Sequence, residues 1–115
     1  MGVLKEFAAD ALKVRILDSR VAMGCDAALA VAACLRDLLK KQKTVNMIFA
    51  AAPSQNDVLA HLTAYRDIDW SRINAFHMDE YIGLPETHDQ SYRYFMNKNL
   101  FDKIDIKKEN TNVPC

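Results

Sequence analysis

The sequence predicts an α/β fold in three layers, with a mainly parallel β-sheet and helices on both of its faces. Two observations carry this prediction. Segments with the apolar spacing of helices alternate along the chain with short apolar runs of strand length, which is the order typical of parallel α/β folds. One run, "TVNMIFAAA" at 44–52, is a continuous apolar segment, and such runs are typical of a central parallel strand covered on both faces.

Size and composition fit one globular domain. The chain has 115 residues, half of them hydrophobic, and its 15 basic and 15 acidic side chains give a formal net charge of zero. This balance favours a soluble protein and provides no basic field for nucleic acid or a membrane surface. No apolar run reaches the roughly 20 residues of a membrane helix. The N-terminus has no signal-peptide pattern, so we expect a cytoplasmic protein.

The first half of the chain is predicted to contain two helices and two strands. Residues 2–12 have the apolar spacing of a short helix, and 13–17 have the composition of a strand. After a break at 18–24, a helix is expected from about 25 to 42. Its first part is apolar nearly all round, which implies burial on more than one side. The strand at 44–52 follows and ends before a proline.

The second half repeats the alternation. Ser54 is expected to begin and cap a helix that continues to about residue 68. A third strand is predicted at 72–78, followed by a loop at 82–90 that contains glycine and proline. The last predicted helix covers 92–104. Three cysteines show neither metal-ligand nor disulfide spacing, and neither a Walker motif nor GxGxxG is present, so no metal and no other cofactor is expected.

The turn after the strand at 44–52 is a candidate phosphate site. Ligands of open parallel sheets bind at the carboxyl ends of the strands. Small side chains at Ala51 and Ala52 allow close approach to the backbone, and Ser54 adds a hydroxyl at a predicted helix start. An ordinary buried turn is the alternative, because the segment contains no glycine and Pro53 removes one backbone donor.

The pair Asp79-Glu80 stands at the end of the next strand. Strand alternation puts His77 and Asp79 on the same side. A carboxylate held at a strand end can act as a general base. The alternative is a carboxylate bonded to backbone amides of the next loop. We expect His77 to be a core histidine and not a catalyst.

The stretch "FHMDEYIGLPETHDQSYRYFMNKNLFDKI" resembles the strand, loop and helix of glucosamine-6-phosphate deaminases (also called isomerases), which are related to 6-phosphogluconolactonases. Residues 76–106 follow the pattern nearly throughout, and "YIGLP" at 81–85 favours the deaminase branch. The first 70 residues match only in the order of elements. The resemblance implies a Rossmann-like fold of the deaminase/isomerase type. Residues 1–115 would form a single α/β unit, the N-terminal half of a larger catalytic domain.

The resemblance also implies a function. The family converts glucosamine 6-phosphate and water to fructose 6-phosphate and ammonia, and Asp79 matches its base, which moves a proton between C2 and C1 of the opened sugar. Ser54, Ala51, Ala52 and Glu80 are the substrate-binding candidates. The expected partner is a small sugar phosphate, and a homo-oligomer is compatible with the sequence.

Two departures from the family pattern keep other functions open. The family's phosphate loop is rich in Gly, Ser and Thr, whereas this chain has "AAAPSQ" at 50–55. The family's Asp, His and Glu of ring opening have no counterpart in these residues, so the 115-residue chain alone is expected to be inactive. The alternatives are a non-catalytic sugar-phosphate-binding sensor domain and an inactive paralogue.

Overall fold

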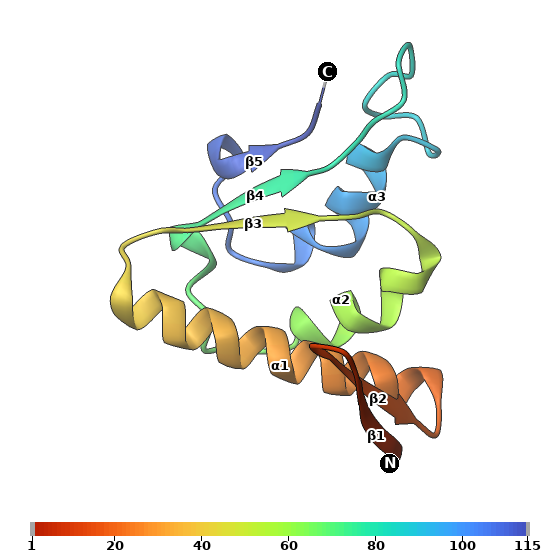
Figure 1. The fold of residues 1–115 in the computed structure, drawn as a ribbon. Helices are drawn as coiled ribbons and strands as arrows, with labels where there is room; N and C mark the ends of the chain where they lie inside the picture. The colour runs from red at the N-terminus through yellow and green to blue at the C-terminus, as the bar shows by residue number, and fades with distance from the viewer. Residues whose placement is uncertain (1, 115) are drawn as a thin grey trace.

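Residues 2–114 are described by a computed structural model, in which a small parallel sheet is covered by helices and a hairpin stands beside them (Figure 1). The arrangement confirms the predicted α/β fold with a parallel sheet. The hairpin consists of β1 (Val3–Ala9) and β2 (Leu12–Leu17); the parallel sheet has the order β3 (Val45–Phe49), β4 (Ile73–His77) and β5 (Thr111–Asn112); the α-helices are α1 (Arg20–Lys41), α2 (Asn56–Leu62) and α3 (Tyr92–Asn99).

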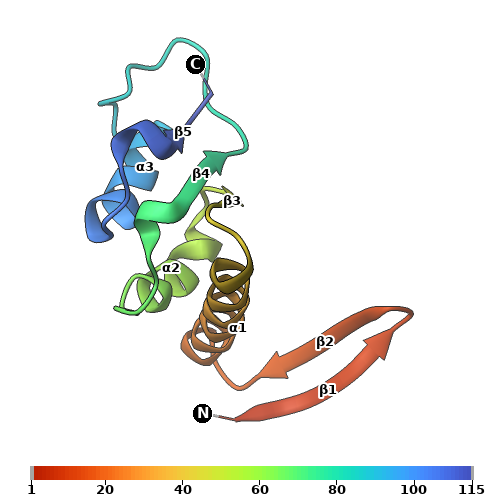
Figure 2. The same ribbon diagram turned by 90° about the vertical axis from the view of Figure 1, so that its left-hand side faces the viewer.

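The N-terminal segment is a β-hairpin, so the helix predicted at 2–12 is wrong. Asp10 adopts a left-handed backbone conformation with φ of 54°, which aspartate accepts more readily than most residues, and it forms the turn with Ala11. Residues 12–17, which alternate between apolar and polar side chains, form β2 and pair antiparallel with β1, so that Phe7 lies opposite Val14. The hydrogen bonds between the two strands stabilise this segment as a strand, although its apolar residues have the spacing of a short helix. The hairpin extends away from the rest of the molecule (Figure 2) and is largely exposed.

α1 begins earlier than the predicted start near residue 25. Ser19 caps it, because its hydroxyl oxygen accepts the N–H of Ala22 at 3.1 Å. The helix is buried along one side only, and Leu29 is 53% exposed, so the expected burial on more than one side is not found. Its buried side contributes Ala28, Ala32 and Leu35 to the core.

β3 is shorter than the predicted strand at 44–52, and it lies at the edge of the sheet in the part of the chain described here. The residues of β3 pair with those of β4, from Val45 opposite Ile73 to Phe49 opposite His77. Ile48 is 67% exposed on the outer face. The prediction of a central strand covered on both faces is therefore wrong within residues 2–114. The apolar run predicted the strand correctly but carried no information on its neighbours.

All three helices pack on one face of the parallel sheet. The chain steps from β3 to β4 to β5 in one direction, and right-handed crossovers in one direction place their helices on the same face. A second helical layer requires the strand order to reverse, and residues 2–114 contain no reversal, so within them the predicted helices on the other face are not found. The core between sheet and helices includes Val45, Phe49, Ile73, Ala75, Leu59, Leu62, Met96 and Leu100.

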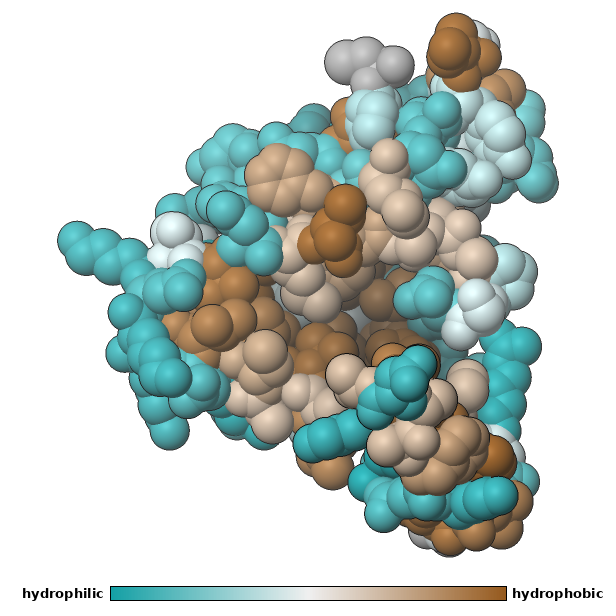
Figure 3. Space-filling view, viewed as in Figure 1, coloured by the Kyte–Doolittle hydropathy of each residue, from teal (hydrophilic) through white to brown (hydrophobic). Residues whose placement is uncertain are grey.

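The open edge of β3 borders an apolar hollow. A cavity of about 310 Å³ lies there, and brown apolar side chains gather around a hollow at the centre of Figure 3. Its lining comes from α1, β3, the turn at 50–55, α2 and Met78, just beyond β4. No helix in the described part of the chain has the length and apolarity needed to cross a bilayer.

Candidate functional site

The turn at 50–55 and Asp79, both predicted to face a ligand, leave the sheet at the edge formed by the carboxyl ends of its strands. β3 and β4 are adjacent and parallel, and the N–H of Met78 donates to the carbonyl oxygen of Phe49 at 3.2 Å. The turn at 50–55 and Asp79 therefore follow neighbouring strands at their carboxyl ends. This is the edge at which open parallel sheets bind their ligands.

The turn after β3 is built differently from the prediction. Pro53–Gln55 form one turn of 3₁₀-helix, and α2 begins only at Asn56 and ends at Leu62. Ser54 is exposed within the 3₁₀ turn, and no side chain caps α2, so the expected helix start at Ser54 is wrong. Ala51 and Ala52 are half-buried before the turn. The hydroxyl of Ser54 remains accessible at this edge.

Arg20 brings a positive charge to this turn. Its guanidinium donates to the carbonyl oxygen of Pro53 and forms an ion pair with the carboxylate of Asp57. The side chain is still 56% exposed. Sequence reasoning missed Arg20, because no local pattern connects the first residue of α1 with a turn more than thirty positions away.

The Asp79 carboxylate is accessible, whereas its backbone is held. Its side chain is 64% exposed, and the Nδ1 of His77 is 3.7 Å from its Oδ1, too far for a hydrogen bond. The same Nδ1 lies 2.6 Å from the Asp79 carbonyl oxygen. Because a carbonyl oxygen only accepts, this contact requires the proton on Nδ1, and the Asp79 N–H, 3.2 Å from the same nitrogen, then finds no lone pair there to accept it. The His77 side chain is fully buried, as expected of a core histidine, and among the described residues its Nε2 has no hydrogen-bond partner.

The sequence allowed two roles for the pair Asp79-Glu80, a general base or a carboxylate bonded to backbone amides. Glu80 has the second role. Its Oε1 accepts the N–H of Tyr92 at 2.8 Å and of Tyr81 at 3.0 Å, and its Oε2 accepts the N–H of Arg93 at 2.8 Å. Partial burial by itself would raise the pKa of Glu80. The backbone N–H groups outweigh burial and hold that pKa below its usual value. Glu80 is therefore a structural anion at the start of α3.

The two tyrosines whose N–H groups bind Glu80 pack against each other. The ring centroids of Tyr81 and Tyr92 are 4.9 Å apart, and the hydroxyl of Tyr92 donates to that of Tyr81 at 3.2 Å. That hydrogen bond, together with burial and the negative charges of Asp79 and Glu80, raises the pKa of Tyr92 to about 12. The Tyr92 ring also lies 5.4 Å from that of His77. Both tyrosines belong to the motif quoted above, but the intervening loop hid their contact from sequence reasoning.

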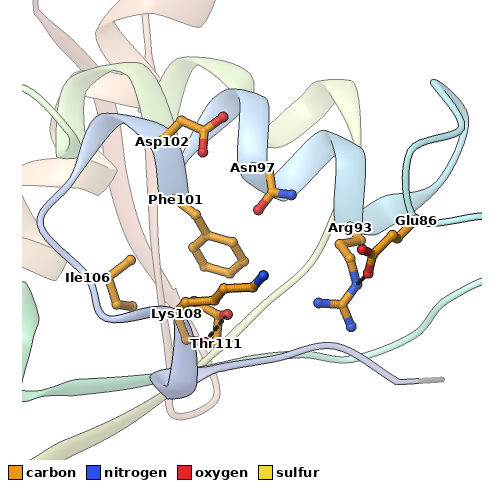
Figure 4. A pocket seen from close by; sticks show the side chains of 8 residues that line it. All are labelled: Glu86, Arg93, Asn97, Phe101, Asp102, Ile106, Lys108 and Thr111. Atoms are coloured by element: carbon orange, nitrogen blue, oxygen red, sulfur yellow. Dashed lines mark hydrogen bonds and ion pairs between the residues drawn. The ribbon is translucent and has the colours of Figure 1, made fainter.

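A separate cavity lies between α3 and the segment that leads into β5. It has a volume of about 330 Å³, and Figure 4 shows Lys108 reaching across it and Glu86 close to Arg93. The Nε of Arg93 is 3.4 Å from the Glu86 carboxylate. Neither Asp79 nor the turn at 50–55 lines this cavity. It is therefore distinct from the candidate site.

Several curated relatives of this chain are named glucosamine-6-phosphate deaminase. No family model matches the chain. It is 41% identical over 88 residues to glucosamine-6-phosphate deaminase 2 of Giardia intestinalis, covering 74% of this chain and 34% of the relative. It is 36% identical over 106 residues to glucosamine-6-phosphate deaminase of Hahella chejuensis, covering 90% and 39%. The chain thus spans less than two fifths of the length of these relatives.

Solved structures agree on the fold. A monomeric glucosamine-6-phosphate deaminase superposes with a TM-score of 0.76 at 21% identity, covering 85% of this chain and 40% of that one. A 6-phosphogluconolactonase from Thermotoga maritima gives a TM-score of 0.73 at 22% identity, covering 85% and 43%. At these identities the likeness shows the fold, which the two kinds of enzyme share.

Proposed function

Because the chain belongs to the glucosamine-6-phosphate deaminase/isomerase family, we propose that it carries the proton-transferring base of an enzyme that converts glucosamine 6-phosphate and water to fructose 6-phosphate and ammonia. In this proposal Asp79 is the base, and residues 1–115 form the N-terminal part of a larger catalytic domain. The relatives, of which the chain spans 34–39%, support this placement.

The observation that carries the proposal is the contrast between two adjacent carboxylates. Both oxygens of Glu80 are engaged by backbone N–H groups, whereas the side chain of Asp79 is 64% exposed at the sheet edge. A base that removes a proton from carbon needs an oxygen that the substrate can reach. Asp79 meets this requirement.

The position of Asp79 suits a transfer between neighbouring carbons. In the opened amino sugar, the carboxylate removes the C2 proton and an enolamine forms. The same carboxylate returns the proton to C1, which leaves an imine at C2. Water adds to that imine, and ammonia departs to give the ketose. One carboxylate serves both carbons without rearrangement because its backbone, just beyond the end of β4, is held by the contact between His77 and the Asp79 carbonyl oxygen.

The turn at 50–55 is the proposed phosphate contact. The small side chains of Ala51 and Ala52 leave the backbone open to approach, and Ser54 offers an exposed hydroxyl. The Arg20 guanidinium at Pro53 adds a cation that the glycine-free turn itself lacks. A phosphate bound here would lie one strand away from Asp79, at the same edge of the sheet.

The test is Asp79→Asn in the complete gene product, assayed for ammonia release from glucosamine 6-phosphate. The amide keeps the size of the side chain but cannot accept a proton from carbon. Turnover should fall by about 10² to 10⁴. The KM should change little, because the proposed phosphate contacts lie elsewhere. Asp89→Asn is the matched control, since Asp89 is an exposed carboxylate in the following loop and should leave turnover unchanged.

The outcomes of these assays distinguish the proposed enzyme from the alternative functions. Normal turnover in the Asp79→Asn variant would refute the role of Asp79 as the base. A wild-type protein that binds the sugar phosphate without releasing ammonia would favour the sensor domain or the inactive paralogue. Residues 1–115 alone are expected to release no ammonia, and measurable release would contradict the need for ring-opening groups outside them.

A further inference from the structure

We infer that Glu80 is a positioning residue, whose carboxylate ties the start of α3 to the end of β4 and thereby fixes the backbone that presents Asp79. This inference rests on the proposed role of Asp79 as the base. It assigns to Glu80 a task different from the substrate contact expected from the sequence.

The sheet itself does not hold Asp79. β4 ends at His77, and the next residue, Met78, makes a last bond to the neighbouring strand through its N–H and the Phe49 carbonyl. Asp79 lies beyond this bond. The accuracy of its carboxylate in a proton transfer must therefore come from contacts outside the sheet ladder.

Glu80 supplies such contacts across a long loop. Residues 81–90 are mostly exposed, and Ile82 is 97% exposed. The carboxylate of Glu80 bypasses this loop, because it binds the N–H groups of Tyr92 and Arg93 directly, each at 2.8 Å. A charge-assisted bond of this length at a helix N-terminus is among the stronger hydrogen bonds in proteins.

We call the bonds from the Glu80 carboxylate to the N–H groups of Tyr92 and Arg93 the Glu80 clamp. The start of α3, to which this clamp attaches, is itself held by further hydrogen bonds. The next N–H along the helix, that of Tyr94, donates to the hydroxyl oxygen of Ser91 at 3.0 Å. Ser91 is buried, and its hydroxyl donates in turn to the Glu86 carbonyl oxygen at 3.1 Å. Glu80 and Ser91 together thus satisfy three N–H groups in the first turn of α3, which a helix cannot satisfy by itself.

His77, two residues before Asp79, holds the same backbone by a contact of its own. Its Nδ1–H donates to the carbonyl oxygen of Asp79 at 2.6 Å, and its ring lies against that of Tyr92, the residue whose N–H Glu80 binds. Asp79 is therefore flanked by two residues that are both tied to Tyr92. The carboxylate of Asp79 is left free for a substrate.

The variants Glu80→Gln and Glu80→Ala in the complete gene product test this inference, with Glu86→Gln as the matched control. Glu86 is a carboxylate of the same loop, 70% exposed. Glutamine keeps one acceptor oxygen and alanine none. The kcat should fall by about 10-fold in the Gln variant and about 100-fold in the Ala variant, with KM within about 3-fold, as for a misplaced base. The control should keep its kcat.

Amide hydrogen exchange gives a readout that does not depend on turnover. Exchange at Tyr92 and Arg93 should be fast in the Ala variant and at least one of the two should be faster in the Gln variant. The backbone order parameter of Asp79 should fall in both. If the Ala variant does not fold, the measurements on the Gln variant decide whether Glu80 positions the backbone of Asp79.

The results separate this inference from the proposed function. If folded Glu80 variants keep kcat and the Asp79 order parameter while Asp79→Asn is slow, the positioning role is refuted and the base stands. If Asp79→Asn turns over normally, the proposed function is refuted. Exchange and order parameters then still decide whether Glu80 fixes this segment.

Discussion

Gly24 of α1 lies directly against Asp57 of α2: a β-carbon built on Gly24 would stand 2.5 Å from the Asp57 β-carbon and 2.8 Å from its carbonyl carbon. Because one of these neighbours is a backbone atom, rotation of a side chain cannot relieve the overlap. Arg20, one turn earlier in α1, forms an ion pair with the same Asp57. The start of α1 therefore fixes the start of α2, and with it the turn at the proposed phosphate site.

Gly24→Ala should consequently destabilise the protein. Alanine favours a helix over glycine by about 1 kcal/mol, but overpacking of this kind costs about 1–3 kcal/mol. We expect the steric term to win, and the free energy of unfolding in urea should fall. Gly2→Ala is the control, because its added β-carbon meets no atom within 4 Å. Unchanged or increased stability of Gly24→Ala would show that the two helices can separate at little cost.

Arg72 closes the other end of α1. Its Nη2 donates to the carbonyl oxygens of Leu39 and Gln42 at 2.6 Å, and its Nε donates to that of Lys43 at 2.8 Å. The carbonyls of Leu39 and Gln42 belong to the end of α1, where the helix itself provides no donors, and that of Lys43 follows just beyond it.

Arg72→Lys should therefore lower the free energy of unfolding by about 1–3 kcal/mol, since an ammonium group cannot reproduce the planar spread of donors. The exposed Arg66→Lys serves as the control and should change stability by less than about 0.5 kcal/mol. Equal stability of the two variants in urea would mean that water replaces the guanidinium at the end of α1.

Glu80 should make stability depend on acid pH. Its pKa in the folded protein lies below the value near 4.5 of the unfolded chain, so its stabilisation is complete above about pH 4.5. It is lost as pH falls through the folded pKa. The difference in unfolding free energy between wild type and Glu80→Gln should therefore shrink as the pH is lowered from about 6 towards about 3. A difference that stays constant over this range would contradict a stabilising role for the ionised Glu80 carboxylate.

The parts of the fold that sequence reasoning predicted are those with strong local signals. The strands at 13–17, 44–52 and 72–78 all correspond to observed strands, and α3 begins at Tyr92, the predicted start of the last helix. The hairpin partner of 13–17 and the two-residue β5 were missed, because strand pairing depends on contacts between distant segments. An apolar run signals a strand; its place in the sheet depends on which strands pair beside it.

The candidate site divides in the same way. The position of Asp79 at a strand end follows from alternation and a breaker-rich loop, both of which are local. The partners of Glu80 lie 12 and 13 residues further on, and those of Arg20 lie beyond 30 residues. No period or spacing rule relates such positions. Which of two adjacent carboxylates is free and which is bound could be decided only in three dimensions.

Tyr92 provides a test of the site at alkaline pH. Its pKa of about 12 in the folded protein lies above the usual value near 10, chiefly because its hydroxyl bonds to that of Tyr81. Between these values the unfolded chain loses the proton and the folded protein keeps it. The stabilisation from this group is therefore complete below about pH 10 and is lost as pH rises towards about 12.

Tyr81→Phe removes the bonding partner and should move the pKa of Tyr92 down towards its usual value. The late step in the tyrosinate absorbance of the wild type should then shift to lower pH, and the alkaline loss of stability should become smaller. Tyr94→Phe, which removes another tyrosine hydroxyl from α3, is the control and should leave the late step in place. A late step that survives in Tyr81→Phe would mean that burial and the charges of Asp79 and Glu80, and not the paired hydroxyls, hold the proton on Tyr92.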